Sequence, residues 1–405
     1  MQKLKEKNYT IEFLRFSFAI NFLMVHVYMV YARAMTGEFV WIYALDNIMP
    51  FMIFAGFFMM HGFKRQQPMA LEKGLTPGRQ AWNYLRTRFI SLMPAFFFAL
   101  LIGFIVNHGI VIRTPLQQWP LALLSHIGEF SGLQIFGIGF GNMSVGAWGN
   151  LPRIIQLLNA PLWFISGLFI VGYFVTYLLA KNESRFLAFI GPVIAVLFYG
   201  SQWLRDSNPF WFDPIAIGDF LIGEAVIHMF IGLWLGCIIW VAVNSLKDKT
   251  FSTGMKTLLT IAAFATGILT IYRTWVPVNI PFWGQLLPMN WGSMHILTIF
   301  LSFIILLNVD GFTWLLNRKI WKVPGRLAFY IYMFHFPIII GLAGFMNTDD
   351  MMGLHILTIA STIVTIIVSY IFMIWNDKVL QPWFAKQPWF VKQQTPKNKD
   401  KEALV

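Results

Sequence analysis

The chain has 405 residues, of which 57% are hydrophobic and only 12% are charged, and its formal net charge is +12. A soluble domain carries about one-quarter charged residues, so this composition excludes an ordinary soluble protein and indicates an integral membrane protein. The basic residues stand in short gaps between apolar runs, as in cytoplasmic loops, so no nucleic-acid partner is needed to explain them. The single cysteine, Cys237, excludes an intrachain disulfide and a thiolate metal cluster.

Apolar runs of about 18 to 25 residues mark membrane-spanning helices. The sequence predicts an all-α integral membrane protein with about ten transmembrane helices, at residues 9–33, 41–63, 89–112, 160–180, 186–202, 219–245, 257–275, 291–309, 327–346 and 352–376. No soluble catalytic domain fits between these runs, so any chemistry takes place inside the bundle or at its surface. We expect one transmembrane domain over residues 1–378 and a cytoplasmic tail, interfacial and then disordered, over 379–405.

The orientation follows from the distribution of Lys and Arg. If the N-terminus is inside, the inner segments hold 24 of the 30 basic residues. Cytoplasmic loops are enriched in Lys and Arg, so this asymmetry predicts that both termini are cytoplasmic and that the number of spans is even.

The first apolar run contains Arg15 and His26. The two residues are eleven positions apart. In a helix this spacing places them about 16 Å apart along the axis and on one face. A charge that faces lipid at mid-membrane is costly, so we expect this face to point into the bundle. The alternative is an arginine that snorkels to the inner headgroups and a histidine that is satisfied in the core.

The N-terminus also resembles a secretory signal, because a basic "MQKLKEK" precedes the apolar run and "ARA" follows at 32–34. Cleavage there would remove Arg15 and His26. The length of the run, Arg15 within it and Arg33 within the site itself argue against cleavage.

Asp46 lies about as far after the first turn as His26 lies before it, which places both at a similar depth. A carboxylate there is a candidate orienting partner for the histidine ring. The alternative is a hydrated residue at the outer end of the second run.

The middle of the chain offers weaker candidates. The outer loop at 113–159 has the size of a lid or of an acceptor-binding surface, or is a mobile surface loop. Trp163 is suited to stacking on a sugar ring, or belongs to the outer aromatic belt. Glu224 and His228 lie four residues apart on one helical face and predict a polar pair, either acceptor-binding or structural.

The late stretch "YIYMFHF" places Tyr332 and His335 on one helical face, three residues apart. They are candidates for a polar site in the bundle, and the alternative is a hydrogen-bonded core pair. No His, Asp and Glu spacing argues for a catalytic metal, and no Gly-rich phosphate loop is found.

The order of several motifs resembles the membrane acyltransferase family 3, whose bacterial multi-span members acylate exported glycans and other surface molecules. The resemblance begins with Arg15, ten residues and His26. It continues with "MPFMIFAGFF", "YLRTRFISLMP", "APLWFISGLF", "HMFIGLWLGC" and "AFYIYMFHFPI", beginning at residues 49, 84, 160, 228 and 328. Each motif is unspecific, but together they cover most of the chain in the family's order.

Three features depart from the family pattern. The family often has two arginines three and six residues before the third-span proline, whereas here Arg88 is followed by Ser91, and Arg86 is a candidate substitute. Leu168 stands where many relatives carry a glutamate. From these residues we expect no additional hydrolase-like domain of the kind that some relatives carry.

The resemblance implies an O-acyltransferase of the bacterial inner membrane that uses acyl-CoA, first of all acetyl-CoA, as co-substrate and needs no metal. Arg86 and Arg88 would bind the phosphates of acyl-CoA at the inner mouth, because the planar guanidinium suits phosphate. Arg15 would meet the donor higher in the same passage. His26 would be the base that takes the proton of an acceptor hydroxyl on a glycan or glycolipid. Tyr332 and His335 would donate to the thioester oxygen or bind the sugar.

Two other readings stay open. A transporter or flippase of a lipid-linked saccharide also uses intramembrane Arg, His and Asp residues, but the sequence shows no convincing internal repeat. A catalytically inactive membrane sensor related to the family is the third. The sequence does not reveal the acceptor, the acyl group or the oligomeric state, and it leaves direct transfer and a covalent acyl-enzyme step both open.

Overall fold

The computed structural model describes residues 8–28, 31, 48–132, 158–204, 214–217, 220–275, 291–346, 348 and 350–386. Within these ranges it leaves out the side chains between 199 and 225, between 270 and 296, and at 384–385. The described chain is helical apart from one short antiparallel hairpin, in which β1 (Pro214–Ile217) pairs with β2 (Phe220–Gly223) so that Ile215 faces Ile222.

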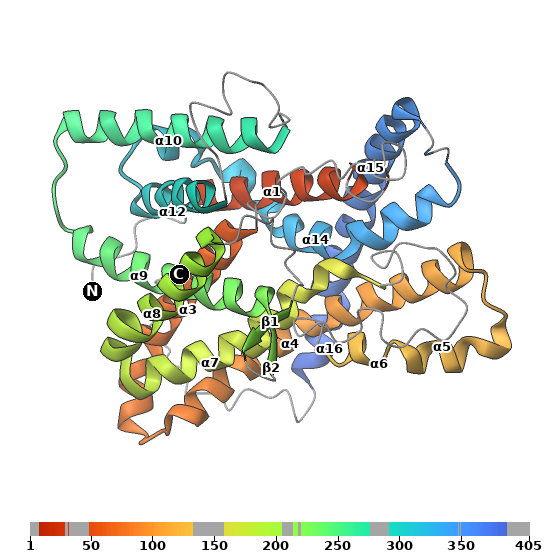
Figure 1. Cartoon of the computed structure of the whole chain (residues 1–405), viewed down its shortest axis with the longest axis horizontal. Helices are drawn as coiled ribbons and strands as arrows, with labels where there is room; N and C mark the ends of the chain where they lie inside the picture. Colours follow the sequence, from red (N-terminus) through yellow and green to blue (C-terminus); the bar gives the residue numbers. More distant parts are fainter. Residues whose placement is uncertain are drawn as a thin grey trace.

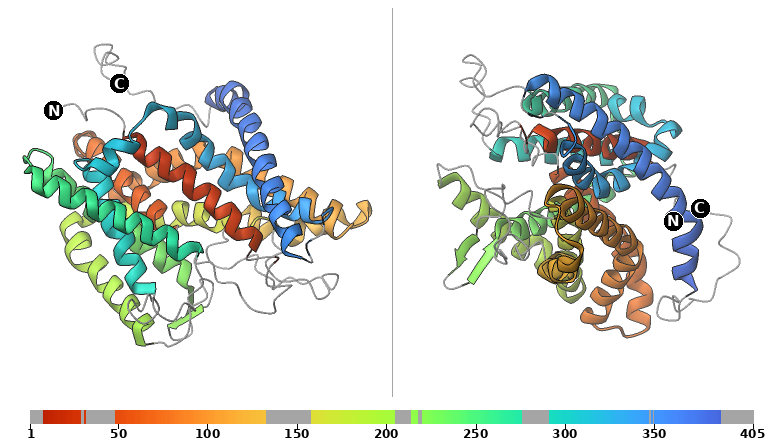
Figure 2. Two further views of the ribbon diagram at one scale, coloured as in Figure 1. Left: turned by 90° about the horizontal axis from the view of Figure 1, so that it is seen from above. Right: turned by 90° about the vertical axis from the view of Figure 1, so that its right-hand side faces the viewer.

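Each of the ten predicted apolar runs contains a long helix. In the described part of the chain these are α1 (Tyr9–Val27), α3 (Met49–Glu72), α4 (Pro77–Ile105), α7 (Trp163–Arg185), α8 (Gly191–Leu204), α9 (Glu224–Leu246), α10 (Thr253–Trp275), α12 (Trp291–Leu307), α14 (Lys322–Ala343) and α15 (Met351–Trp375). Their arrangement is shown in Figure 1 and, from two further sides, in Figure 2.

Short helical pieces connect or extend the long helices. They are α5 (Trp119–Ser125), α6 (Ile127–Phe130), α13 (Gly311–Leu316) and α16 (Gln381–Ala385), with 3₁₀ turns at Leu116–Gln118, Ala160–Leu162 and Lys319–Trp321 and π-helical turns at Val106–Val111, Phe186–Ile190 and Asn376–Leu380. The first part of the predicted outer loop is therefore helical. Helix also continues beyond residue 378, where we expected the tail to begin.

In the part of the chain that the structure describes, six helical stretches are long and apolar enough to cross a membrane by length and composition: Tyr9–Val27, Pro77–Val111, Ala160–Phe198, Val226–Leu246, Lys319–Ala343 and Met351–Trp383. The stretch Ala160–Phe198 is not one straight helix. Asn182 has non-helical backbone angles, φ −163° and ψ 94°, and the chain folds back there. This stretch therefore contains two helices, α7 and α8, that run in opposite directions.

The contacts between helices fix the relative direction of most of them. Two contacts, Glu12 with Gly325 and His26 with His335, make α1 and α14 parallel. In the same way, α4 and the π-helical turn that extends it are parallel to α14, because Val106 contacts Gly341 and Ile110 contacts Gly344. Helices α4 and α7 are antiparallel. Their contacts pair Tyr84 with Gly172 and Phe89 with Phe169.

The other half of the bundle follows the same rule. Helix α3 is parallel to α7 through Phe51–Phe164 and Lys64–Glu183, and parallel to α9 through Met52–Gly232 and Phe57–Gly236. Helix α8 is antiparallel to α9, and α15 is antiparallel to α14. The directions of these eight helices are those expected of a chain that reverses its direction at every predicted span.

Candidate functional site

Two histidines from opposite ends of the chain meet where α1 packs on α14. The Nε2 atom of His335 lies 3.3 Å from Nδ1 of His26, and the ring centroids are 5.0 Å apart. Both side chains are buried, with 6% of His26 and none of His335 exposed. The sequence predicted each residue separately, but it paired His335 with Tyr332 and did not predict this contact.

The hydrogen bonds assign the protons of the two rings. Nδ1 of His335 lies 2.9 Å from the carbonyl oxygen of Tyr332, and Nδ1 of His26 lies 2.8 Å from that of Phe22. A carbonyl oxygen only accepts, so each Nδ1 carries the hydrogen. In the neutral pair, the single hydrogen on Nδ1 of His26 is then shared between the Phe22 carbonyl oxygen and Nε2 of His335, the carbonyl being the closer acceptor. Nε2 of His26 keeps its lone pair. Among the described residues, none hydrogen-bonds that atom.

Aromatic rings enclose the histidine pair. Phe22 and Phe336 contact the His26 ring edge-on, at 4.4 and 5.7 Å between centroids. Tyr332 packs beside His335, and its hydroxyl donates to the carbonyl oxygen of Pro161 at the start of α7. The hydroxyl thus connects α14 with the 3₁₀ turn that precedes α7. Its predicted role toward a thioester oxygen or a sugar stays a prediction.

Arg15 lies on α1, closer to the N-terminal end of the helix than His26, and makes an ion pair with Glu12 at 3.2 Å. About one-third of its side chain is exposed, whereas only 8% of the Glu12 side chain is. A Cβ at Gly325 would collide with Glu12, so the absence of a side chain there lets α14 approach this pair. Sequence analysis missed Glu12, although its spacing of three residues from Arg15 is typical of a helical ion pair.

Arg86 and Arg88 lie in the first half of α4, at the end of the bundle where α1 begins, and both are partly buried. The guanidinium of Arg88 lies over the Tyr84 ring, 5.6 Å from its centroid. This contact orients the guanidinium.

The remaining predicted residues lie elsewhere. Trp163 is the first residue of α7 and is buried, with its ring against Phe164. The ring of His228 packs edge-on against Phe198 of α8, at 4.6 Å between centroids, so its observed contact is with α8. Asp46 lies outside the described residues, as does the side chain of Glu224, and their predicted pairings stay predictions.

Sequence analysis missed a second buried polar cluster, that of His108, His126 and Glu129, beyond the C-terminal end of α4. Nε2 of His108 lies 3.1 Å from Nε2 of His126, whose Nδ1 donates to the Glu129 carboxylate at 2.8 Å. Nδ1 of His108 also lies 2.9 Å from the Thr114 hydroxyl. Glu129 is completely buried. The signal for this cluster was weak, because only the fold-back at residues 112–126 brings the two histidines together.

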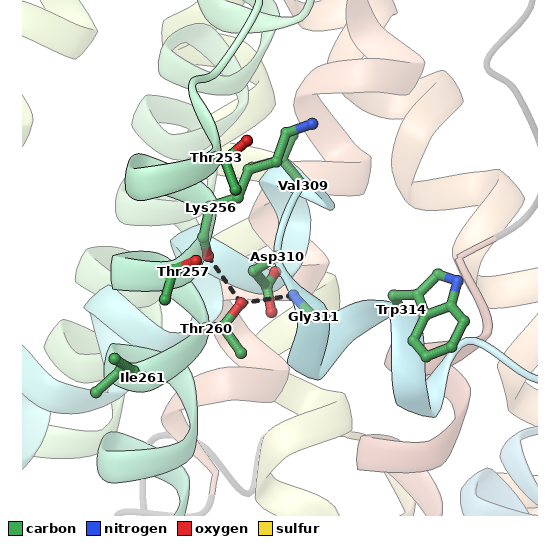
Figure 3. A pocket seen from close by; sticks show the side chains of 9 residues that line it. All are labelled: Thr253, Lys256, Thr257, Thr260, Ile261, Val309, Asp310, Gly311 and Trp314. Atoms are coloured by element: carbon green, nitrogen blue, oxygen red, sulfur yellow. Dashed lines mark hydrogen bonds between the residues drawn. The ribbon is translucent and has the colours of Figure 1, made fainter.

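A cavity of about 420 Å³ opens between α10 and α13 (Figure 3). Its lining is Thr253, Lys256, Thr257, Thr260, Ile261, Val309, Asp310, Gly311 and Trp314. The Thr260 hydroxyl accepts from the Gly311 amide at 2.7 Å, which holds α13 against α10. None of the predicted site residues lines this cavity. No group of three or more His, Cys, Asp or Glu residues in the described chain is placed to hold a metal ion.

A family model described as an acyltransferase domain, that of acyltransferase family 3, matches residues 8–374. The chain belongs to acyltransferase family 3. The match spans both histidines of the pair and all the long helices but the last residue of α15. Together with the apolar helices, it makes this family 3 protein a multi-pass membrane acyltransferase. Comparisons with curated proteins and with solved structures find no match.

Proposed function

We propose that this family 3 acyltransferase moves an acetyl or similar short acyl group from cytoplasmic acyl-CoA to a hydroxyl of an exported or surface glycan or glycolipid. The observation that carries the proposal is the pairing of His26 with His335. It holds one ring nitrogen of His26 by hydrogen bonds and leaves the lone pair of the other available inside a dehydrated bundle.

This arrangement suits a general base. The acceptor O–H bond breaks as its proton moves to Nε2 of His26, and the acceptor oxygen bonds to the thioester carbonyl carbon. The C–S bond then breaks, and the thiolate takes the proton back from Nε2, so that ester and CoA thiol are the products. A positioned base of this kind contributes roughly a hundred- to ten-thousand-fold in rate. His335 acts here by holding the His26 ring.

The donor would enter from the end of the bundle at which α1 and α4 begin. Arg86 and Arg88 supply two partly buried cations there, and Arg15 stands between them and His26 along the axis of α1. Phosphates are bound well by arginine, because its fork of donors matches their oxygens. Charge reversal at both Arg86 and Arg88 should raise KM for acetyl-CoA far more than reversal at the exposed Lys73. Equal effects would indicate surface charge and no specific donor site.

The directions of the helices support ten crossings of a bacterial inner membrane with both ends in the cytoplasm. Because α4 is parallel to both α14 and α1, one more crossing is required between α1 and α4, and α3 is the helix that supplies it. The reversal at Asn182 likewise requires α8 to cross between α7 and α9. The positive-inside distribution of Lys and Arg then places the N-terminal ends of α1 and α4 inside.

The decisive experiment separates transfer from transport. Proteoliposomes that contain the protein, loaded with radiolabelled acetyl-CoA on the cytoplasmic side, should release CoA thiol and label a glycan acceptor supplied on the other side. Cells that lack the protein should lose the same acyl ester from their surface glycans. A flippase of a lipid-linked saccharide would instead move unlabelled saccharide and release no thiol.

A further inference from the structure

A proline inside α14 leaves a backbone carbonyl next to the histidine pair without its helical hydrogen-bond partner. Pro337 has no N–H, so the carbonyl four residues earlier, that of Met333, loses its helical hydrogen-bond partner. Met333 is completely buried, so water does not replace that partner. The Asn159 side chain does so: its Nδ2 donates to the Met333 carbonyl oxygen at 2.7 Å.

The turn that Asn159 contacts is the one that sets His335. Met333 stands between Tyr332 and His335, and Nδ1 of His335 is held by the carbonyl oxygens of Ile331 and Tyr332 at 3.1 and 2.9 Å. The path of the backbone through these residues therefore decides where the His335 ring points. The position of that ring decides in turn how His26 is held.

Asn159 is itself firmly held. The backbone amides of Leu158 and Asn159 donate to the carboxylate of Glu129, the closest contact being 3.1 Å from the Leu158 nitrogen. Two residues later, the Pro161 carbonyl accepts from the Tyr332 hydroxyl. The segment 158–161 thus joins the cluster of His108, His126 and Glu129 to two adjacent residues of α14, Tyr332 and Met333.

We infer that Asn159 is a positioning residue for the acyl transfer, and that Glu129 supports it. Asn159 occupies the carbonyl that Pro337 leaves without a partner, and by doing so it holds the His335–His26 pair in the geometry of the base. The inference rests on the proposed function, and it adds to that function a residue just before the 3₁₀ turn Ala160–Leu162, which no motif in the sequence connects with the histidines.

The test combines three variants and one control, assayed in proteoliposomes by thiol release from acetyl-CoA with a methyl glycoside as the acceptor. Asn159→Ala should lower kcat roughly ten- to hundredfold, because small displacements of catalytic groups have effects of this size. KM for acetyl-CoA should stay unchanged, because the donor phosphates bind at the far end. Glu129→Gln should lower kcat in the same direction by a smaller factor.

Pro337→Ala provides the rescue. It restores an N–H to the helix, which then satisfies the Met333 carbonyl without Asn159. The double variant Asn159→Ala/Pro337→Ala should therefore recover most of the kcat that Asn159→Ala loses. A merely structural role predicts that kcat per folded molecule is unchanged in Asn159→Ala while its thermal stability falls.

Asn376→Ala is the matched control. It removes another buried asparagine bond to α14, the one from Nδ2 to the Tyr330 hydroxyl at 2.9 Å, but on the half of α14 away from His335. It should lose stability and keep kcat. If Asn159→Ala keeps the wild-type kcat, or if Pro337→Ala gives no rescue, the positioning role is wrong while the acyltransferase stands. If the wild-type protein releases no thiol, the proposed function fails first.

Discussion

At the scale of single residues, the site depends on directed hydrogen bonds. The backbone carbonyls of Phe22 and Tyr332 fix a hydrogen on Nδ1 of His26 and of His335 respectively. The His26 ring is then the donor and the His335 ring the acceptor in the contact between them. The lone pair that stays available is the one on Nε2 of His26. A histidine held through one nitrogen by a neighbour is the general arrangement of a base with an orienting partner.

His335→Ala tests the contribution of that neighbour. The variant removes one of the two acceptors around Nδ1–H of His26, the other being the Phe22 carbonyl oxygen, and leaves the base in place. We therefore expect kcat to fall by about tenfold while KM for acetyl-CoA is unchanged. The measurement is steady-state thiol release in membranes with matched amounts of protein. If the two rings act together, His26→Ala/His335→Ala should be no slower than His26→Ala. Losses that multiply would show that the histidines act independently.

At the scale of helices, close approach depends on glycine. A Cβ at Gly325 would overlap Glu12 of α1, one at Gly56 would overlap the Leu233 backbone of α9, and one at Gly103 would overlap the Leu158 carbonyl. Each of these glycines lies in the interior of a helix, where glycine by itself is unfavourable. Packing therefore outweighs helix propensity at these three positions.

Gly325→Ala should separate α14 from α1 and disturb both the Glu12–Arg15 pair and the histidine contact. We expect a loss of about 1–3 kcal/mol in stability and a lower kcat, since overfilling a close contact has this cost. Gly62→Ala in α3 is the matched control, because nothing lies within 4 Å of its added Cβ. It should be neutral or slightly stabilising in a thermal-unfolding assay. Equal melting temperatures for the two variants would contradict the packing argument.

At the scale of the whole molecule, the sequence predicted where the long helices lie, because a run of apolar residues is long enough to be recognised without knowledge of its neighbours. It did not predict which helices meet. His26 and His335 are 309 residues apart, and Asn159 and Met333 are 174 apart. Pro337 indicates that one backbone carbonyl lacks a helical hydrogen-bond partner, but the group that replaces this partner depends on how the helices pack. Sequence analysis missed the cluster of His108, His126 and Glu129 for the same reason.

The topology can be tested with single cysteines in a Cys237→Ala background. Lys73, Asn182 and Asp248 are exposed and should be labelled by an impermeant maleimide from the cytoplasmic side, whereas Arg113 should be labelled from the opposite side. Asn182 is the most informative position, because ten alternating crossings place it at the inner surface. A single crossing over Ala160–Phe198 would bury position 182 in the membrane and leave it unlabelled.

The central claim is that His26 is the base for acyl transfer, and His26→Gln tests it most directly. Glutamine keeps a polar side chain of similar reach, which can still donate to the Phe22 carbonyl, but it has no nitrogen that can take a proton. The measurement is kcat for thiol release and for acyl transfer to a glycoside, with His26→Ala and wild type at matched amounts. We predict that both variants lose roughly a hundred- to ten-thousand-fold in kcat, with the protein still folded and inserted. Substantial transfer by His26→Gln would show that His26 is a core hydrogen-bonding residue and that the base lies elsewhere.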